Sequence, residues 1–258
     1  MGLNVVSTHS RLRVLPFTLE SELKEAAFNH GYRYDNGRAD GWLFFYSDTV
    51  PGEIALAASD TLWFLSVAHR GVAAELKSER ADPPAGNGRA AFVFDNQSFM
   101  RAAISRCYQL SASLPTLPLE RFEEQMATLG DTEVERLVRQ RVGQDIFRSA
   151  LMDYWQGRCP LTGITTPELL RASHIVPWAD CESDAQRLDV HNGLLLAAHW
   201  DAAFDAGLVS FDEDGRVLRS SKLDNAARSM LISADSCIPI DEAHQQPMAW
   251  HRQHRFVD

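Results

Sequence analysis

The chemically suggestive side chains of this sequence are gathered in residues 172–212. A Ser-His pair, Ser173 and His174, stands near the start of this stretch, and His199 and Asp201 stand near the start of an expected helix. Imidazole acts as a base or a ligand near neutral pH, and carboxylates are oxygen ligands for divalent cations. Apolar runs separate the two polar ends. The pattern is typical of a small metal site on a compact scaffold.

The elements that would position these side chains can be read from the same stretch. A first strand is expected at Leu169 to Val176, ended by Pro177, and a charged loop at Glu182 to Gln186. Asn192-Gly193 indicates a turn. A second strand follows at Leu194 to Ala197, and a helix at His199 to Ala206, ended by Gly207. The order is strand, loop, strand, helix. We expect it to bring the imidazole of His174 and the carboxylate of Asp201 onto one shared ion.

A long helix precedes this unit. Thr132 and Glu135 form a capping-box pattern, and apolar residues recur with helical period up to Tyr154. The motifs RCPLTG, SHIVPW and HNGLLLAAHWDAAFDAGLVSFD then follow in order. Together with this helix, residues 136–212 resemble the HNH endonuclease family, in particular its bacterial restriction-type branch. The resemblance extends over roughly residues 136–258 and implies a ββα-metal fold that hydrolyses DNA with one divalent cation.

The resemblance also implies roles for single residues. His174 matches the general base, and Asn192 matches the central asparagine, whose amide or carbonyl would orient that imidazole and fix its tautomer. The helix ligand commonly follows the asparagine by nine residues, which selects Asp201, with His199 as the alternative. Ser173 stands where the family commonly has Asp or another metal ligand. Oxygen ligands favour Mg or Mn over zinc, and His199 could share an ion with Asp201 only if it precedes the regular helix.

Each of these residues also has a purely structural interpretation. A single histidine before Ile-Val-Pro is more often hydrogen-bonded within the fold than catalytic. Asn192 before Gly193 is a common turn former. Asp201 and Asp205 could be solvated acids of a first helical turn. For His174 the catalytic interpretation is favoured, because several motifs of the family occur in the expected order around it.

Composition sets the wider limits. The 258 residues are 45% hydrophobic, enough for one large domain or two ordinary ones. The charge balance, 25 − 35 = −10, means that any basic face for DNA must be local. Four scattered cysteines without a C-x-x-C pair indicate neither a zinc ribbon nor a disulfide framework. Without a long apolar run or a leader pattern, we expect a soluble, cytoplasmic protein with no membrane partner.

The first half of the sequence favours an antiparallel sheet with helices. We expect strands at 1–17, 42–47, 53–58, 61–68, 72–76 and 90–94, helices at 20–29 and 95–110, and an interdomain linker at 111–118. The sequence GNGRAA at 86–91 matches the residue pattern of a dinucleotide-binding motif. That motif must open a helix, whereas this sequence leads into a strand, so we expect a hairpin loop. Aromatic residues at 42–46 and 63–64 could line a pocket for a flipped base, but a sheet core is the stronger expectation.

The predicted fold class is therefore α+β. Residues 1–112 would form an α+β domain that selects the DNA target, and residues 119–258 a helical region carrying the nuclease unit, with its core at 158–212. We predict a metal-dependent DNA endonuclease of restriction or phage defence, as a monomer or a homodimer. The alternative is a catalytically silent DNA-binding module that reads modified bases, which Ser173 and the acidic charge favour. A structural or protein-binding role is a third alternative.

Overall fold

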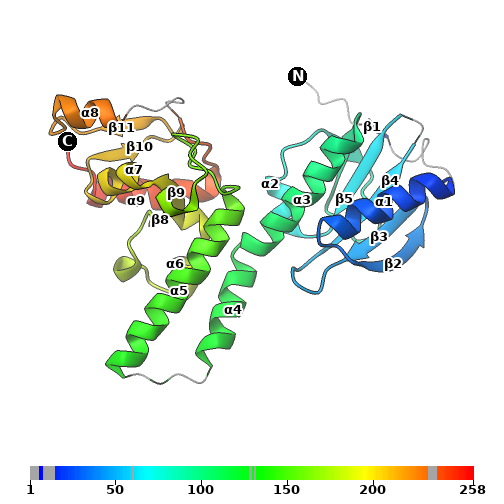
Figure 1. The fold of residues 1–258 in the computed structure, drawn as a ribbon, viewed down its shortest axis with the longest axis horizontal. Coiled ribbons are helices and arrows are strands. Elements are labelled where there is room, and N and C mark those ends of the chain that lie inside the picture. Colours follow the sequence, from blue (N-terminus) through cyan, green and yellow to red (C-terminus); the bar gives the residue numbers. More distant parts are fainter. Residues whose placement is uncertain (1–5, 8–14, 60, 128–129, 131, 232–236) are drawn as a thin grey trace. The chain divides into compact units, whose positions relative to one another are not determined.

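The computed structural model describes residues 6–7, 15–59, 61–127, 130, 132–231 and 237–258. These residues form two compact units, Met1–Ala112 and Ser113–Asp258 (Figure 1). The predicted α+β class is confirmed, since a mostly antiparallel sheet occupies the first half and the second half combines helices with two small hairpins. Among the described helices, none is both long and apolar enough to cross a bilayer.

A seven-stranded sheet with the order β1-β6-β7-β5-β4-β3-β2 carries the first unit. β1 runs parallel to β6, and the other neighbours are antiparallel. The strands are β1 (Val6–Ser7), β2 (Tyr34–Ala39), β3 (Trp42–Tyr46), β4 (Glu53–Ala58), β5 (Trp63–Val67), β6 (Arg80–Asp82) and β7 (Ala90–Phe94). Helices α1 (Phe17–Asn29), α2 (Arg70–Glu75) and α3 (Gln97–Ser113) accompany them.

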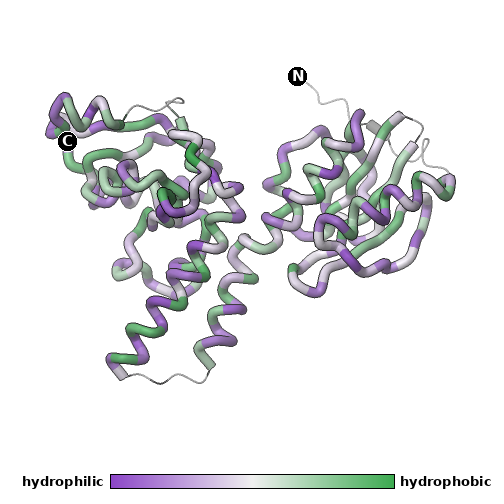
Figure 2. Tube along the Cα trace, viewed as in Figure 1, coloured by the Kyte–Doolittle hydropathy of each residue, from purple (hydrophilic) through white to green (hydrophobic). Residues whose placement is uncertain are grey.

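The core of this unit lies around the central strands. β4, β5 and β7 are almost wholly buried, whereas the edge strand β2 is exposed along its length, and Figure 2 shows the central strands as mainly hydrophobic. Trp42, Phe45 and Phe64 are buried. The sheet-core interpretation of the aromatic residues is therefore confirmed for these three.

Three predictions for the first unit need correction. Residues 72–76 lie in and after α2 rather than in a strand, because His69 caps the helix by accepting a hydrogen bond from the Val72 N–H at 3.2 Å. The predicted linker 111–118 is mostly helical: it holds the end of α3 and the start of α4 (Thr116–Met126), where prolines of the first turn are tolerated. The helix expected from residue 95 begins at Gln97, and Asn96 caps it by accepting a hydrogen bond from the Ser98 N–H at 2.7 Å.

Two further expectations concern less regular segments. Of the strand expected at 1–17, residues 6–7 form β1, residues 1–5 and 8–14 lie outside the described residues, and Phe17 begins α1. The GNGRAA sequence lies in and after the connection between antiparallel strands β6 and β7, so the predicted hairpin loop is confirmed.

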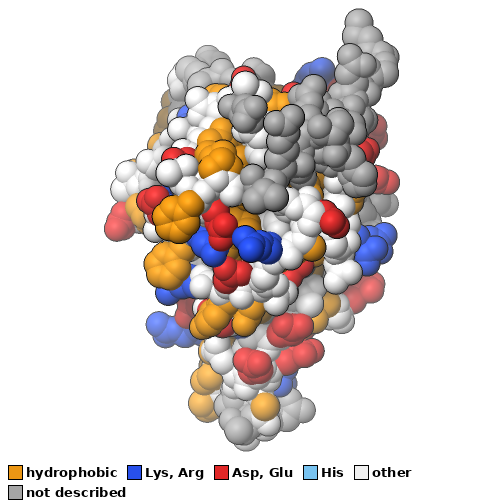
Figure 3. All heavy atoms as spheres, turned by 90° about the vertical axis from the view of Figure 1, so that its right-hand side faces the viewer, with side chains coloured by type: hydrophobic (Ala, Val, Ile, Leu, Met, Phe, Trp, Pro, Cys, Tyr) orange, Lys and Arg blue, Asp and Glu red, His pale blue; other side chains and the backbone are white. Residues whose placement is uncertain are grey.

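Charges of both signs share the surface. On the face seen in Figure 3, Lys and Arg side chains are interspersed with Asp and Glu. Within the first unit Lys24 bridges Glu20 and Asp35 at 2.9 and 3.2 Å, and Arg38 also pairs with Glu20. The described part of this face is therefore mixed rather than continuously basic.

The second unit begins with α4 and α5 (Glu133–Tyr154), and the predicted capping box of Thr132 and Glu135 is confirmed. Its further elements are η1 (Pro167–Leu169), β8 (Leu170–His174), η2 (Trp178–Asp180), α6 (Asp184–Arg187), η3 (Val190–Asn192), β9 (Gly193–Ala197), α7 (Ala198–Asp205), β10 (Val209–Phe211), β11 (Val217–Arg219), α8 (Asn225–Met230) and α9 (Glu242–His254). β8 and β9 form an antiparallel hairpin in which His174 is paired with Gly193.

Close packing on α5 fixes this hairpin. A Cβ at Gly193 would lie 2.4 Å from Phe147 and 2.9 Å from Leu151, so only glycine lets the strand approach the helix this closely. Asn192-Gly193 does not form the hairpin turn that the sequence suggests, because residues 175–192 make a long connection containing η2, α6 and η3. Likewise, the expected charged loop at 182–186 includes the start of α6.

Candidate functional site

His174, the last residue of β8, lies in an aromatic slot. Its imidazole stacks on Phe147 of α5 with ring centroids 3.8 Å apart and an interplanar angle of 15°. The Trp178 ring stands edge-on to the imidazole at 5.7 Å. Nε2 lies 2.8 Å from the carbonyl oxygen of Arg187. These contacts fix the plane and the rotation of the ring.

The same contacts fix the chemical state of His174. A carbonyl oxygen only accepts hydrogen bonds, so Nε2 carries the ring hydrogen and Nδ1 carries the lone pair. Burial and the nearby Arg187 charge lower the pKa of His174 to about 4, although the hydrogen bond to the Arg187 carbonyl acts in the opposite direction. The imidazole is therefore neutral near pH 7, and no described residue hydrogen-bonds to Nδ1. A neutral ring with a free lone pair can accept a proton.

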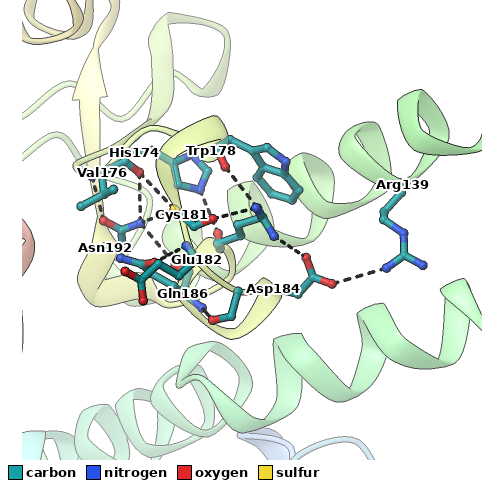
Figure 4. A network of polar contacts seen from close by, with 11 residues as sticks. Arg139, His174, Val176, Trp178, Cys181, Glu182, Asp184, Gln186 and Asn192 are labelled. Atoms are coloured by element: carbon teal, nitrogen blue, oxygen red, sulfur yellow. Dashed lines mark hydrogen bonds and ion pairs between the residues drawn. The ribbon is translucent and has the colours of Figure 1, made fainter. Parts of the chain in front are cut away.

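Asn192 holds the connection between the strands rather than the imidazole. Its side chain is buried, and Oδ1 accepts the Val176 N–H at 2.8 Å (Figure 4). Nδ2 donates to the carbonyls of Val176 and Gln186, each at 3.2 Å, and lies 3.4 Å from Cys181 Sγ. The predicted direct contact of the Asn192 amide with His174 is not found. The amide instead satisfies buried main-chain groups of the loop that encloses the ring.

Ser173 and Asp201 meet between β8 and α7. The Ser173 hydroxyl donates to Asp201 Oδ1, and Ser173 is 3% exposed. Asp205 follows one helical turn after Asp201, on the same side of α7. Burial raises the pKa of Asp205, the Asp201 charge raises it further, and Arg255 lowers it. The site therefore has two adjacent carboxylates, one of which is held by a hydroxyl.

His199 has a different position from the one required for sharing an ion with Asp201. α7 begins at Ala198, so His199 lies inside the helix rather than before it. Side chains two apart on a helix point in different directions. The His199 ring is tilted against its neighbour Trp200 at 6.4 Å. The helix therefore groups Asp201 with Asp205 and not with His199.

Whether His174 and Asp201 converge on one ion stays a prediction. Neighbouring residues of a strand project to opposite faces, and here Ser173 contacts α7 while His174 stacks on α5. The imidazole therefore leaves β8 in a different direction from the Ser173 hydroxyl that holds Asp201.

Several residues of the site were not predicted from the sequence. Phe147 shows in the sequence only as one apolar position of a helical pattern, and Trp178 only as an aromatic after Pro177. Arg255, directly after α9, donates a hydrogen bond from Nη2 to the Asp205 carbonyl at 2.8 Å. The contacts of Phe147 and Arg255 join elements that are distant along the chain, and Trp178 lies outside β8, so strand or helix spacing predicts none of the three contacts.

Comparison with known proteins identifies a family for part of the second unit. Residues 159–212 match the family described as HNH endonuclease, so the predicted resemblance is confirmed for that segment, and such a segment indicates a nuclease. A solved structure titled modification-dependent TagI restriction endonuclease aligns with 43% of this chain and 37% of its own, at 18% identity and a TM-score of 0.31. This chain thus spans well under two thirds of that protein. No curated protein matches the chain.

The two carboxylates of Asp201 and Asp205 suit a hard divalent cation, the kind of metal ion that HNH nucleases generally use. Asp201 and Asp205 offer oxygen donors of the type that Mg or Mn prefers. Their proximity raises the pKa of Asp205, so a bound cation would relieve a repulsion already present. Ser173 already donates its hydrogen to Asp201 and is better described as a support for that carboxylate than as a charged ligand. The donor set therefore favours Asp201 with Asp205.

Proposed function

We propose that this chain is a metal-dependent DNA endonuclease in which His174 acts as general base. The observation that carries this proposal is the hydrogen bond from His174 Nε2 to the Arg187 carbonyl. It leaves the Nδ1 lone pair free on a ring held by aromatic contacts. General-base catalysis requires a positioned acceptor that is unprotonated at the working pH. The lowered pKa of His174 meets that requirement at neutral pH.

Phosphodiester hydrolysis proceeds by in-line displacement, with the attacking and leaving oxygens on opposite sides of phosphorus. His174 would take a proton from the attacking water. Asp201 and Asp205 would hold a Mg or Mn ion on the other face of the end of β8. When bound, that ion would supply the positive charge that stabilises the leaving oxygen. The different directions in which Ser173 and His174 leave β8 are consistent with these two separate roles.

The proposal extends to the rest of the chain. The first unit would select the DNA target, by sequence or by base modification, and the biological role would be restriction or phage defence. Its mixed surface charges make strong sequence-independent binding improbable on the face of Figure 3, so target selection would rest on local contacts. Whether the protein is a homodimer stays a prediction, and light scattering of the purified chain will test it.

The experiment is cleavage of modified and unmodified plasmid DNA with Mg or Mn. His174→Gln is expected to lower the cleavage rate about 10²- to 10⁴-fold, the usual contribution of a general base. His254→Gln is the matched control, because His254 is exposed on α9 and its hydrogen bond and ring stacking within the described residues are both with Trp250. Equal rates for His174→Gln and the wild type, with both folded, would disprove the role of His174.

A second candidate function is a catalytically silent DNA-binding module. Ser173 favours it, because a neutral hydroxyl stands where the family commonly has a charged ligand. Divalent-ion titration separates the two functions. A silent module would shift DNA in a gel at low salt and cleave none of it with any metal, whereas an enzyme would show turnover that depends on the metal. A chain that neither binds nor cleaves DNA would have a structural role.

A further inference from the structure

Arg187 contacts the connection between β8 and β9 through three side-chain nitrogens. Nε donates to the Trp178 carbonyl at 3.1 Å, Nη2 donates to the Cys181 carbonyl at 2.7 Å, and Nη1 pairs with Asp184 at 2.9 Å. The guanidinium carbon also lies 5.6 Å from the centre of the Trp178 ring. A planar fork of fixed donors can hold several acceptors at once. One side chain thus ties together three points of the loop.

The main chain of the same residue contacts His174. The Arg187 carbonyl accepts the hydrogen bond from His174 Nε2 at 2.8 Å. Trp178, whose carbonyl the guanidinium holds, also presents its ring to the imidazole. Two of the three described groups that surround the ring are therefore fixed by Arg187. Phe147, the third, belongs to α5 and is independent of the loop.

We propose that Arg187 is a positioning residue for the nuclease site, which folds the loop so that its own carbonyl holds His174 in the tautomer with Nδ1 unprotonated. Its relevance to catalysis rests on the proposed function, whereas its effect on the tautomer does not. Lysine could keep the charge but not the three-way contact, because an ammonium is a single point of attachment. The substitution Arg187→Lys therefore separates geometry from charge.

Arg139 provides a matched control for Arg187. It extends from α5 to the same carboxylate, with Nη1 3.4 Å from Asp184 Oδ2, and its guanidinium lies over Phe122. It makes no described contact with the Trp178 or Cys181 carbonyls. Arg139→Gln therefore removes a charge and an ion pair from the same network without touching the carbonyls around His174.

The test is the tautomer of His174, measured by nitrogen-15 NMR of the imidazole at pH 7. We expect the wild type and Arg139→Gln to carry the hydrogen on Nε2, and Arg187→Gln and Arg187→Lys to show a mixture of the two tautomers. A wild-type ring protonated on Nδ1 would overturn the proposal without any variant. An unchanged tautomer in folded Arg187→Lys would overturn it as well, and this variant decides the matter if Arg187→Gln does not fold.

Kinetics on a short DNA duplex supply the second readout. Arg187→Gln is expected to lower kcat about 10- to 100-fold with little change in KM, because it displaces the base rather than the bound substrate. Arg139→Gln should keep the wild-type kcat. A fall confined to melting temperature, with kcat unchanged in the folded variant, would mean that Arg187 only stabilises the loop. If the wild type cleaves no DNA, the proposed function fails and the tautomer still decides on Arg187.

Discussion

Asn192 binds the main chain of Val176 through both of its polar groups: the Val176 N–H donates to Oδ1 at 2.8 Å, and Nδ2 donates to the Val176 carbonyl at 3.2 Å. Both residues are buried. The pairing mimics one step of an antiparallel strand and closes the loop two residues after His174. Asn192 thereby stabilises the loop beside His174, and none of its described side-chain hydrogen bonds is to the imidazole.

Removing this amide should be costly. Asn192→Ala removes the acceptor of the buried Val176 N–H and one donor each from the carbonyls of Val176 and Gln186, so we expect the free energy of unfolding to fall by about 2 to 4 kcal/mol. Asn192→Asp should be no better, because a carboxylate would face two carbonyl oxygens. Urea denaturation checks both values. A loss below 0.5 kcal/mol in both variants would show that the loop does not depend on this residue.

The contact between Gly193 and α5 leads to a second prediction. Gly193→Ala adds a methyl group 2.4 Å from Phe147 in a buried strand, so we expect a loss of about 1 to 3 kcal/mol from overpacking. Because Phe147 stacks on His174, the cleavage rate should fall too. Gly37→Ala, where the added methyl meets nothing within 4 Å, is a partial control, although its positive φ adds its own strain. Equal melting temperatures for Gly193→Ala and wild type would contradict the packing argument.

The sequence predicted this part of the chain well wherever the signal was local. The capping box at Thr132 and the order of β8, β9 and α7 both depend on neighbours a few residues apart. Residues 72–76 were predicted wrongly because the apolar run VAAEL suits a strand or a helix equally. There the cap supplied by His69 decides for the helix.

The parts that could not be predicted depend on contacts between distant segments. The aromatic slot of His174 joins Phe147 to Trp178, and the tautomer of His174 depends on the carbonyl of Arg187. A carbonyl belongs to every residue, so no side-chain pattern could identify it. The face to which His174 points also depends on β8 register, which its short apolar run leaves open.

The pH dependence of activity should reflect the environment of His174. Its pKa of about 4 lies below the ordinary value of 6.5, so the ring stays unprotonated until the pH falls well below 6. We expect kcat/KM to remain level from pH 7 to about pH 5 and to decline toward pH 4. The measurement is a pH profile at saturating metal, with melting curves to exclude unfolding. A decline centred near pH 6.5 would mean that the ring is solvated.

A buried histidine outside the site should make stability pH-dependent. His251 stacks on Phe204 at 3.9 Å and bonds to Ser210 and the Phe204 carbonyl, and burial lowers its pKa to about 4 from 6.5. The unfolded chain therefore binds more protons between these values, so stability is complete above pH 6.5 and falls as the pH drops toward 4. The loss should reach about 3 kcal/mol.

The variant His251→Phe isolates this contribution, because phenylalanine keeps the stacking and cannot titrate. Its stability should fall less steeply than that of the wild type between pH 6.5 and 4, although His174 still contributes in both proteins. Urea denaturation at several pH values measures the slopes. Identical slopes in the two proteins would show that His251 is not buried in its neutral form.

The negative charge of Asp205 beside Asp201 should lower the stability of the metal-free protein and strengthen metal binding. Burial and the nearby Asp201 raise the pKa of Asp205, so its ionised form is disfavoured in the folded chain. Asp205→Asn removes that charge, and we expect a higher melting temperature in a chelator than the wild type shows. With Mn the order should reverse, because the variant loses an oxygen ligand of negative charge. Asp214→Asn, which changes an exposed acid, should alter neither value. A variant that binds Mn as tightly as the wild type, measured by calorimetry, would remove Asp205 from the metal site and leave Asp201 as its anchor.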